Sequence, residues 1–326
     1  MASRLSGNLE IQPRDIAIGF LPLIVGLVGG RILDRMGRTT GAFDLMMVAN
    51  SHLEAAARLK MLATWVLANA IALSAIAYFA WTVRLFGRKS QAMLLAAYVG
   101  VAVIGLIVVW QKAGGNSEVL MTRPALCAPL RLVDAGRSDD RTTLHVSPGA
   151  HWPQNREPAY AVACSESPSF KMLQSVNDWQ RYLLALVLPA LVLGAISCLP
   201  RHSGDESRQT DDIERLKVWL YLAAANFVSG LLYMSALLRW PGYAYEGAAS
   251  VAYNAHVSGY VLYLGVSFTI FIAAYYLPIY IRLVSRLDAS PRTDLGRPIQ
   301  PLDLTKLALS AFAPAIAGLL GDVLAL

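Results

Sequence analysis

The chain has 326 residues, of which 56% are hydrophobic and only 15% are charged, and its formal net charge is +6. A soluble globular domain carries about 45–50% apolar and about 25% charged residues, so this composition excludes an ordinary soluble protein. The apolar residues also gather in uncharged runs long enough to cross about 30 Å of hydrocarbon as helices. We therefore predict an all-α integral membrane protein, a polytopic helical bundle of about seven transmembrane helices with a small extracytoplasmic cap containing minor β structure.

Residues 1–110 are predicted to form an N-terminal membrane region with three spans, near Ile16–Gly30, Met61–Val83 and Ala92–Trp110. The first run is short, but it lacks a small-residue cleavage site at its end, which favours an uncleaved span over a signal peptide. Residues 43–60 repeat apolar side chains at helical spacing and are predicted to form an amphipathic helix that runs into the second span. Its apolar side consists of Phe43, Met46, Met47, Leu53 and Ala57.

Residues 111–181 are predicted to form the extracytoplasmic loop or cap. Arg141–Val146 and Tyr160–Cys164 are rich in β-forming residues, and prolines punctuate the rest, which is typical of a short hairpin. Cys127 and Cys164 are candidates for a disulfide, which would stabilise the loop by roughly 3–4 kcal/mol in the chain-entropy model. Two unpaired thiols are the alternative.

Residues 182–326 are predicted to form a C-terminal membrane region of about four spans. The connections 200–217 and 282–306 carry mixed charge or prolines and are predicted to be solvated tethers. The last run contains Pro314 and Asp322, and a spanning helix is favoured over an interfacial one. The four runs lie near Tyr182–Leu199, Val218–Leu238, Tyr260–Ile281 and Leu307–Leu326.

The positive charges indicate an orientation. Every Lys and Arg lies outside the seven predicted intervals, and over the short connections 14 of them fall on one side and 6 on the other. Since cytoplasmic loops are enriched in cations, the N-terminus is predicted to be cytoplasmic and the loop 111–181 extracytoplasmic. The expected location is a cell membrane crossed several times, most simply a bacterial inner membrane with a periplasmic loop.

Polar residues in or beside the spans are the candidate site. Asn69 lies in the second predicted span, Asn226 and Ser229 lie in the fifth, and Glu246 and His256 precede the sixth. Polar groups in a membrane are expensive and often functional, so these residues are candidates for ligand binding or a proton path. Hydrogen bonds that merely bridge helices are the alternative. No catalytic residue, cofactor or metal is predicted, because no known ligand spacing or phosphate-binding loop occurs.

The sequence favours a non-catalytic membrane subunit or scaffold over an enzyme. Its spans are almost free of ionisable groups, and small residues recur at helix-packing spacing, as in Gly194 and Cys198 or Ala317 and Gly321. The expected partners are the lipid bilayer and another membrane protein or a second copy, and no nucleic acid. Two alternatives remain open: a transporter or channel with a polar path along the fifth and sixth spans, and a membrane-embedded enzyme acting on a lipid or envelope precursor.

Overall fold

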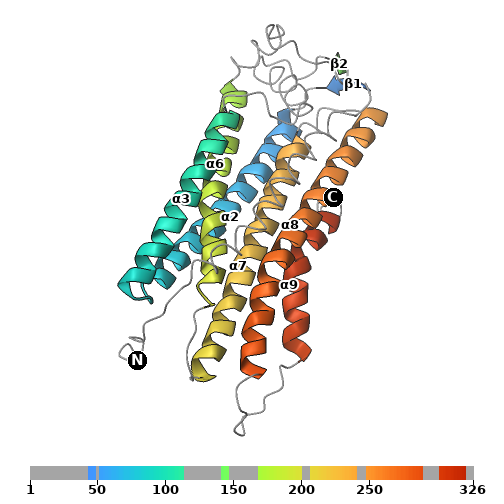
Figure 1. Ribbon diagram of the computed structural model, residues 1–326. Coiled ribbons are helices and arrows are strands. Elements are labelled where there is room, and N and C mark those ends of the chain that lie inside the picture. The colour runs from blue at the N-terminus through green and yellow to red at the C-terminus, as the bar shows by residue number, and fades with distance from the viewer. Residues whose placement is uncertain are drawn as a thin grey trace.

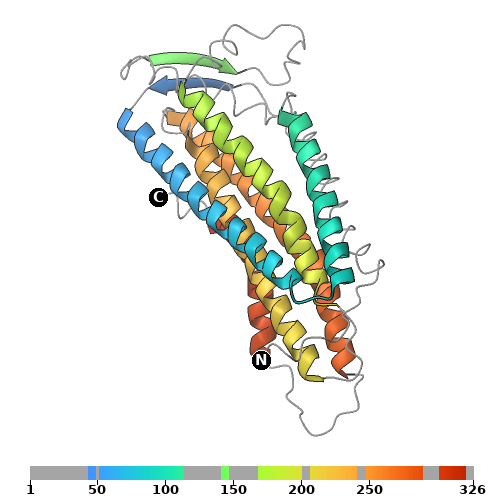
Figure 2. The ribbon, with the colours of Figure 1, turned by 90° about the vertical axis from the view of Figure 1, so that its left-hand side faces the viewer.

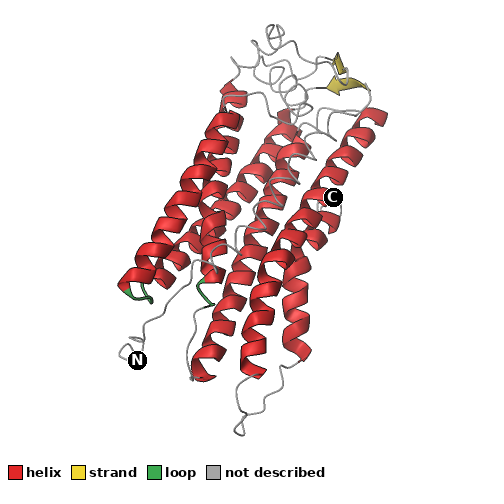
Figure 3. Ribbon diagram, viewed as in Figure 1, coloured by secondary structure: helices red, strands yellow, loops and turns green. Residues whose placement is uncertain are grey.

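The structure is a bundle of long helices with a pair of short strands at one end (Figures 1 and 3). The computed structural model describes residues 43–48, 51–113, 141–146, 168–199, 206–240, 247–288 and 301–320. In chain order its elements are β1 (Phe43–Val48), α2 (Ser51–Val83), α3 (Arg88–Ala113), β2 (Arg141–Val146), α6 (Pro168–Ile196), α7 (Glu206–Arg239), α8 (Gly247–Asp288) and α9 (Pro301–Leu320).

Five of these helices are long and apolar enough to cross a membrane, so the predicted multi-pass helical architecture is confirmed at that level. Helix α9 contributes a shorter apolar stretch, Leu309–Leu319. The predicted first span, Ile16–Gly30, lies outside the described residues. The five candidate spans are Ala55–Val83, Arg88–Trp110, Ser175–Ile196, Asp211–Arg239 and Tyr253–Val284.

The bundle has two distinct ends. We call the end that carries β1 and β2 the strand end, and the end that carries the turn between α2 and α3 the turn end (Figures 1 and 2). That turn is closed by backbone hydrogen bonds from Arg84 N to Trp81 O (3.1 Å) and from Gln91 N to Gly87 O (2.9 Å). Successive helices run in opposite directions, so α6 returns to the turn end and α7 starts there (Figure 1).

The predicted amphipathic helix over residues 43–60 is wrong in its first part. Phe43–Val48 form the strand β1, which pairs antiparallel with β2 so that Phe43 lies opposite Val146 and Val48 lies opposite Arg141. The helix begins only at Ser51. The mostly apolar run FDLMMV is too short for its pattern to distinguish a strand from a helix, and the strand partner decides between them. The partner is β2, which lies far along the chain from β1. The second predicted β segment, Tyr160–Cys164, lies outside the described residues.

The helices extend well beyond the apolar runs that predicted them. Helix α6 starts at Pro168, whose fixed φ and missing N–H suit a first helical position. Helix α7 starts at Glu206, so most of the predicted tether 200–217 is helical. The apolar runs end at the first charge, whereas the helices continue because their backbone hydrogen bonds do not depend on side-chain polarity.

Trp219 is the centre of the packing. Helix α7 contacts α2, α6, α8 and α9, and the Trp219 side chain on α7 is fully buried. Its indole lies against Gly194 of α6, where a Cβ atom would come within 2.3 Å of the ring. The Tyr78 ring of α2 packs on it at a centroid distance of 4.8 Å. The close approach at Gly194 is thus a genuine helix–helix contact, as its small size predicted.

Helix α9 is joined to α8 by a second close approach. A Cβ atom at Gly265 would lie 2.6 Å from the carbonyl oxygen of Pro314, and one at Gly318 would lie 3.2 Å from the Cα atom of Leu262. The Ala315 N–H donates to Thr269 Oγ1 (3.1 Å), so α8 supplies a side-chain acceptor beside the proline. The α9 glycine in this contact is Gly318, one residue after the predicted Ala317, and Gly321 lies outside the described residues.

Replacing Gly194 with alanine is expected to destabilise the protein by about 1–3 kcal/mol, because the added methyl group must displace the Trp219 indole. Thermal unfolding in detergent, followed by tryptophan fluorescence, measures the loss. Gly230→Ala on α7 is the matched control, since a Cβ atom there meets nothing within 4 Å. Equal melting temperatures for the two variants would contradict the packing described here.

Candidate functional site

A hydrogen-bonded network joins α2 to α6 toward the strand end. The Trp179 indole N–H donates to Asn69 Oδ1 (2.8 Å). The Asn69 amide nitrogen donates to Gln180 Oε1 (3.2 Å) and to the carbonyl oxygen of Trp65 (2.7 Å). Asn69 was predicted as a polar site residue, and the structure shows that its amide links two helices. Its α6 partners escaped prediction because they precede the apolar run.

An ion pair lies within the same span of α6. Asp178 Oδ1 and Arg181 Nη1 are 3.8 Å apart, and their side chains are only 25% and 32% exposed. At a rise of about 1.5 Å per residue, Arg181 lies about 9 Å inside the start of the span at Ser175. Charged residues at such depth are rare and often functional.

Three polar atoms in the adjoining apolar cluster are buried and find no hydrogen-bond partner among the described residues: Trp65 Nε1, Tyr233 Oη and Trp240 Nε1. The Tyr233 and Trp240 side chains are at most 1% exposed. A buried donor left unsatisfied costs about 1–3 kcal/mol. Trp65 lies on α2, Tyr233 lies on α7 and Trp240 directly follows α7, so these donors gather where the two helices pack together.

The predicted residues of the fifth and sixth spans take other positions. Asn226 and Ser229 are buried in α7, and the Ser229 hydroxyl donates to the Asn226 carbonyl within the helix (3.0 Å). Beside them the rings of Phe227 and Phe268 stack at a centroid distance of 4.6 Å. Where α7 faces α8 at this level, aromatic rings fill the contact.

The α7–α8 contact at the strand end is polar. Arg239 Nη2 donates to Ser258 Oγ (3.0 Å), and the Tyr253 hydroxyl donates to the Leu238 carbonyl (2.5 Å). His256 lies in α8 between these contacts, but its side chain lies outside the described part of the structure. Glu246 also lies outside the described residues, as do Cys127 and Cys164. Their predicted roles stay predictions.

A second polar group surrounds the end of α6 at the turn end. Ser197 Oγ donates to the Gly194 carbonyl (2.5 Å), and the Tyr275 hydroxyl donates to the Val192 carbonyl, so side chains cap the last turn. Cys198 follows and is fully buried. Burial, together with the nearby negative charge of Asp212, raises the pKa of the Cys198 thiol to about 12. A thiol in this environment is chemically inert.

Asp212 itself is 2% exposed and pairs with Arg215 one turn along α7, at 3.2 Å. An ion pair this deep requires mutual neutralisation, because an isolated charge would carry a large desolvation cost. The Tyr276 hydroxyl donates to the Trp219 carbonyl (3.0 Å) beside it. The sequence predicted that Asp212 lies in a solvated connection. This prediction is wrong, because the packing of α7 against α6 buries the Asp212 side chain.

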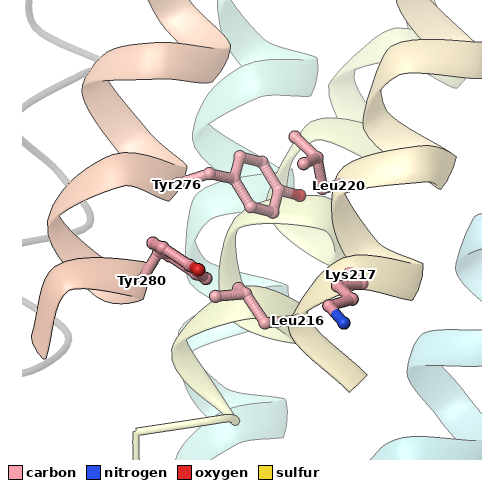
Figure 4. Close-up of a pocket in the computed structure, with 5 residues that line it drawn as sticks. All are labelled: Leu216, Lys217, Leu220, Tyr276 and Tyr280. Atoms are coloured by element: carbon pink, nitrogen blue, oxygen red, sulfur yellow. The ribbon is translucent and has the colours of Figure 1, made fainter. Parts of the chain in front are cut away.

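A shallow groove opens between α7 and α8 next to this group (Figure 4). It encloses about 10 Å³, room for about one water molecule. Its walls are the side chains of Leu216, Lys217 and Leu220 from α7 and of Tyr276 and Tyr280 from α8.

Neither polar group has the composition of a metal centre. Among the described residues no three His, Cys, Asp or Glu side chains lie close enough together to hold a metal ion. In the described part of the chain, the two groups can form hydrogen bonds through indole, amide and phenol groups. Each also contains an ion pair, Asp178–Arg181 in one and Asp212–Arg215 in the other.

Taken together, the five spans and the two polar groups define a multi-pass helical membrane protein. Comparison of the chain with protein-family models, with curated proteins and with solved structures finds no match. Its function has to follow from its own contacts.

Asn69→Leu is expected to lower the free energy of unfolding by about 1–2 kcal/mol, since two interhelical hydrogen bonds disappear and Trp179 and Gln180 lose a partner. Thermal unfolding in detergent measures the change. Ser74→Ala is the control, because the exposed Ser74 hydroxyl bonds only to its own helix, at the Ala70 carbonyl. A destabilisation no larger than that of the control would show that the Asn69 network does not stabilise the bundle.

Cys198 is expected to resist alkylation in the folded protein. With a pKa of about 12, only about one thiol in 10⁴ is ionised at pH 8, and the side chain is fully buried. The experiment uses a Cys127→Ser, Cys164→Ser variant, which leaves Cys198 as the only one of the three cysteines. Mass spectrometry should find maleimide on this residue only after denaturation, and stoichiometric labelling of the folded protein would contradict its placement.

Proposed function

We propose that this protein is a non-catalytic membrane subunit whose partner docks on α3. The observation that supports this proposal is the small share of α3 that is buried against the other described helices. Only 11% of its span is buried, compared with 61% for α7. Its contact with α6 centres on Gly105, where a Cβ atom would lie 3.2 Å from the Cβ atom of Ala185.

The outward face of α3 has the composition of a helix-packing surface. Ala92, Ala96 and Gly100 are exposed and recur every four residues, and a Cβ atom at Gly100 would meet nothing within 4 Å. In a membrane, small residues at this spacing let two backbones approach closely, whereas lipid contact alone does not require them. Val103 and Ile107 continue the same exposed face with larger apolar side chains.

The finer topology is part of the same proposal. We propose seven spans, with Ile16–Gly30 first and Leu307–Leu326 last, and a cap built on residues 111–181 at the strand end. The cations Arg84, Arg88 and Lys89 at the α2–α3 turn support a cytoplasmic turn end. The membrane would then be a bacterial inner membrane, with the cap in the periplasm.

A transporter is the second candidate. The ion pair Asp178–Arg181 within α6 and the unpartnered hydroxyl of Tyr233 favour it, because charged and polar groups inside spans commonly mark a substrate path. The aromatic contact of Phe227 with Phe268 between α7 and α8 counts against a path at that level.

Extraction of the protein from its native membrane in a mild detergent is expected to recover a stoichiometric partner, either a second copy or a different polypeptide. Gly100→Leu should reduce that association about tenfold, because the leucine side chain separates the two backbones. Native mass spectrometry measures the ratio of complex to free chain.

Ala274→Leu provides the matched control, since Ala274 is also small and exposed but lies on α8. It should leave the association unchanged. Recovery of a lone, stable monomer from wild-type membranes would overturn the subunit proposal and favour the transporter.

A further inference from the structure

The turn between α2 and α3 carries three exposed cations on a fixed part of the bundle. Arg84, Arg88 and Lys89 lie in this short segment, and all three residues are exposed. The turn is anchored from within, because the Phe86 side chain is only 4% exposed and packs into the main apolar cluster. The cations therefore surround a fixed point of the fold at the turn end (Figure 2).

The length of this connection limits its distance from the membrane. Only residues 84–87 separate the candidate spans Ala55–Val83 and Arg88–Trp110. At about 3.5 Å per residue, a connection this short between two helices rises at most about 7 Å above their ends. The headgroup layer on each side of a bilayer is about 5–8 Å thick. The three cations are therefore confined to the layer that contains the lipid phosphates.

Trp81 indicates the same level independently. It lies in the last turn of α2, its side chain is 51% exposed, and its ring stacks on that of Tyr78 at a centroid distance of 5.5 Å. Tryptophan is enriched at the headgroup level, because its ring is apolar and its indole N–H is polar. An exposed tryptophan one helical turn before Arg84 is typical of a segment at the lipid–water boundary.

The chain provides no carboxylate beside these cations. No Asp or Glu occurs between Glu54 and Glu118 in the sequence. Among the described residues none of the three cations forms an ion pair, and the carboxylates of Asp212 and Glu214 at the same end pair within α7. Like charges held this close repel one another, and an anion from outside the chain relieves that repulsion.

We propose that the α2–α3 turn binds the headgroup of an anionic phospholipid, with Arg84, Arg88 and Lys89 around the phosphate and Trp81 beside the lipid backbone. Guanidinium groups suit this ligand, because they bind phosphate oxygens in pairs. Basic residues next to a span are a recurrent means of attracting anionic lipids. The inference does not rest on the subunit proposal, because the lipid contacts the turn and not the face formed by the small residues of α3.

The test is native mass spectrometry of the delipidated full-length protein, titrated with phosphatidylglycerol and with phosphatidylcholine of the same acyl chains. Arg84→Gln and Arg88→Gln are each expected to weaken phosphatidylglycerol binding about fivefold and to leave phosphatidylcholine binding unchanged. Arg88→Lys should retain most of the binding, because the positive charge remains. Both arginines are exposed, so unchanged melting temperatures are expected to confirm that the variants fold.

Lys60→Gln is the matched control, because Lys60 is an exposed cation of α2 toward the strand end. A loss as large as that of Arg84→Gln would indicate diffuse electrostatic attraction and overturn the site. Equal affinity of the unmodified protein for the two lipids would also overturn it, and would leave the cations to an acidic partner protein. Glycerol 3-phosphate in excess should not displace the lipid, and its displacement would assign the turn to a soluble phosphate compound instead.

Discussion

The packing of the Trp219 indole against Gly194 is the contact on which the rest of the bundle depends. It sets the distance between α6 and α7, and the same tryptophan packs against Tyr78 of α2. Its carbonyl accepts the Tyr276 hydroxyl of α8, so four helices meet at one residue. In a membrane, where lipid is as apolar as the helices, such van der Waals fit and occasional hydrogen bonds are what hold spans together.

The two polar groups follow from that arrangement. At the turn end, where the Trp219 indole packs on Gly194, Asp212 of α7 is buried beside Cys198. Toward the strand end, α6 is joined to α2 by the hydrogen bonds of the Asn69 network. The Trp219–Gly194 contact and the buried Asp212 thus lie together near the turn end, whereas Asn69 lies in the middle of its span, Ala55–Val83. Among the five described spans, α3 is the least buried, and its small residues Ala92, Ala96 and Gly100 are exposed.

The composition and hydropathy of the sequence were enough to predict helices, their approximate centres and a multi-pass membrane architecture, because uncharged runs of this length have no other stable environment. Asn69 was also correctly singled out as a polar residue within a span. The ends of the helices were missed because charges bounded each apolar run. That is why Asp178, Arg181 and Asp212 appeared to lie in loops, although each belongs to a helix.

The sequence by itself determined which segments lie in lipid and which lie in water. The free energy of transferring a side chain between water and lipid depends on that side chain alone. Only the tertiary structure decided which residues contact one another. It paired Phe43–Val48 with Arg141–Val146, directed the Asn69 amide to α6, and kept Ser229 bonded to its own helix. It also left α3 the least buried of the five described spans. Hydrogen bonds and close packing join residues far apart in the chain, and no local pattern specifies which two will meet.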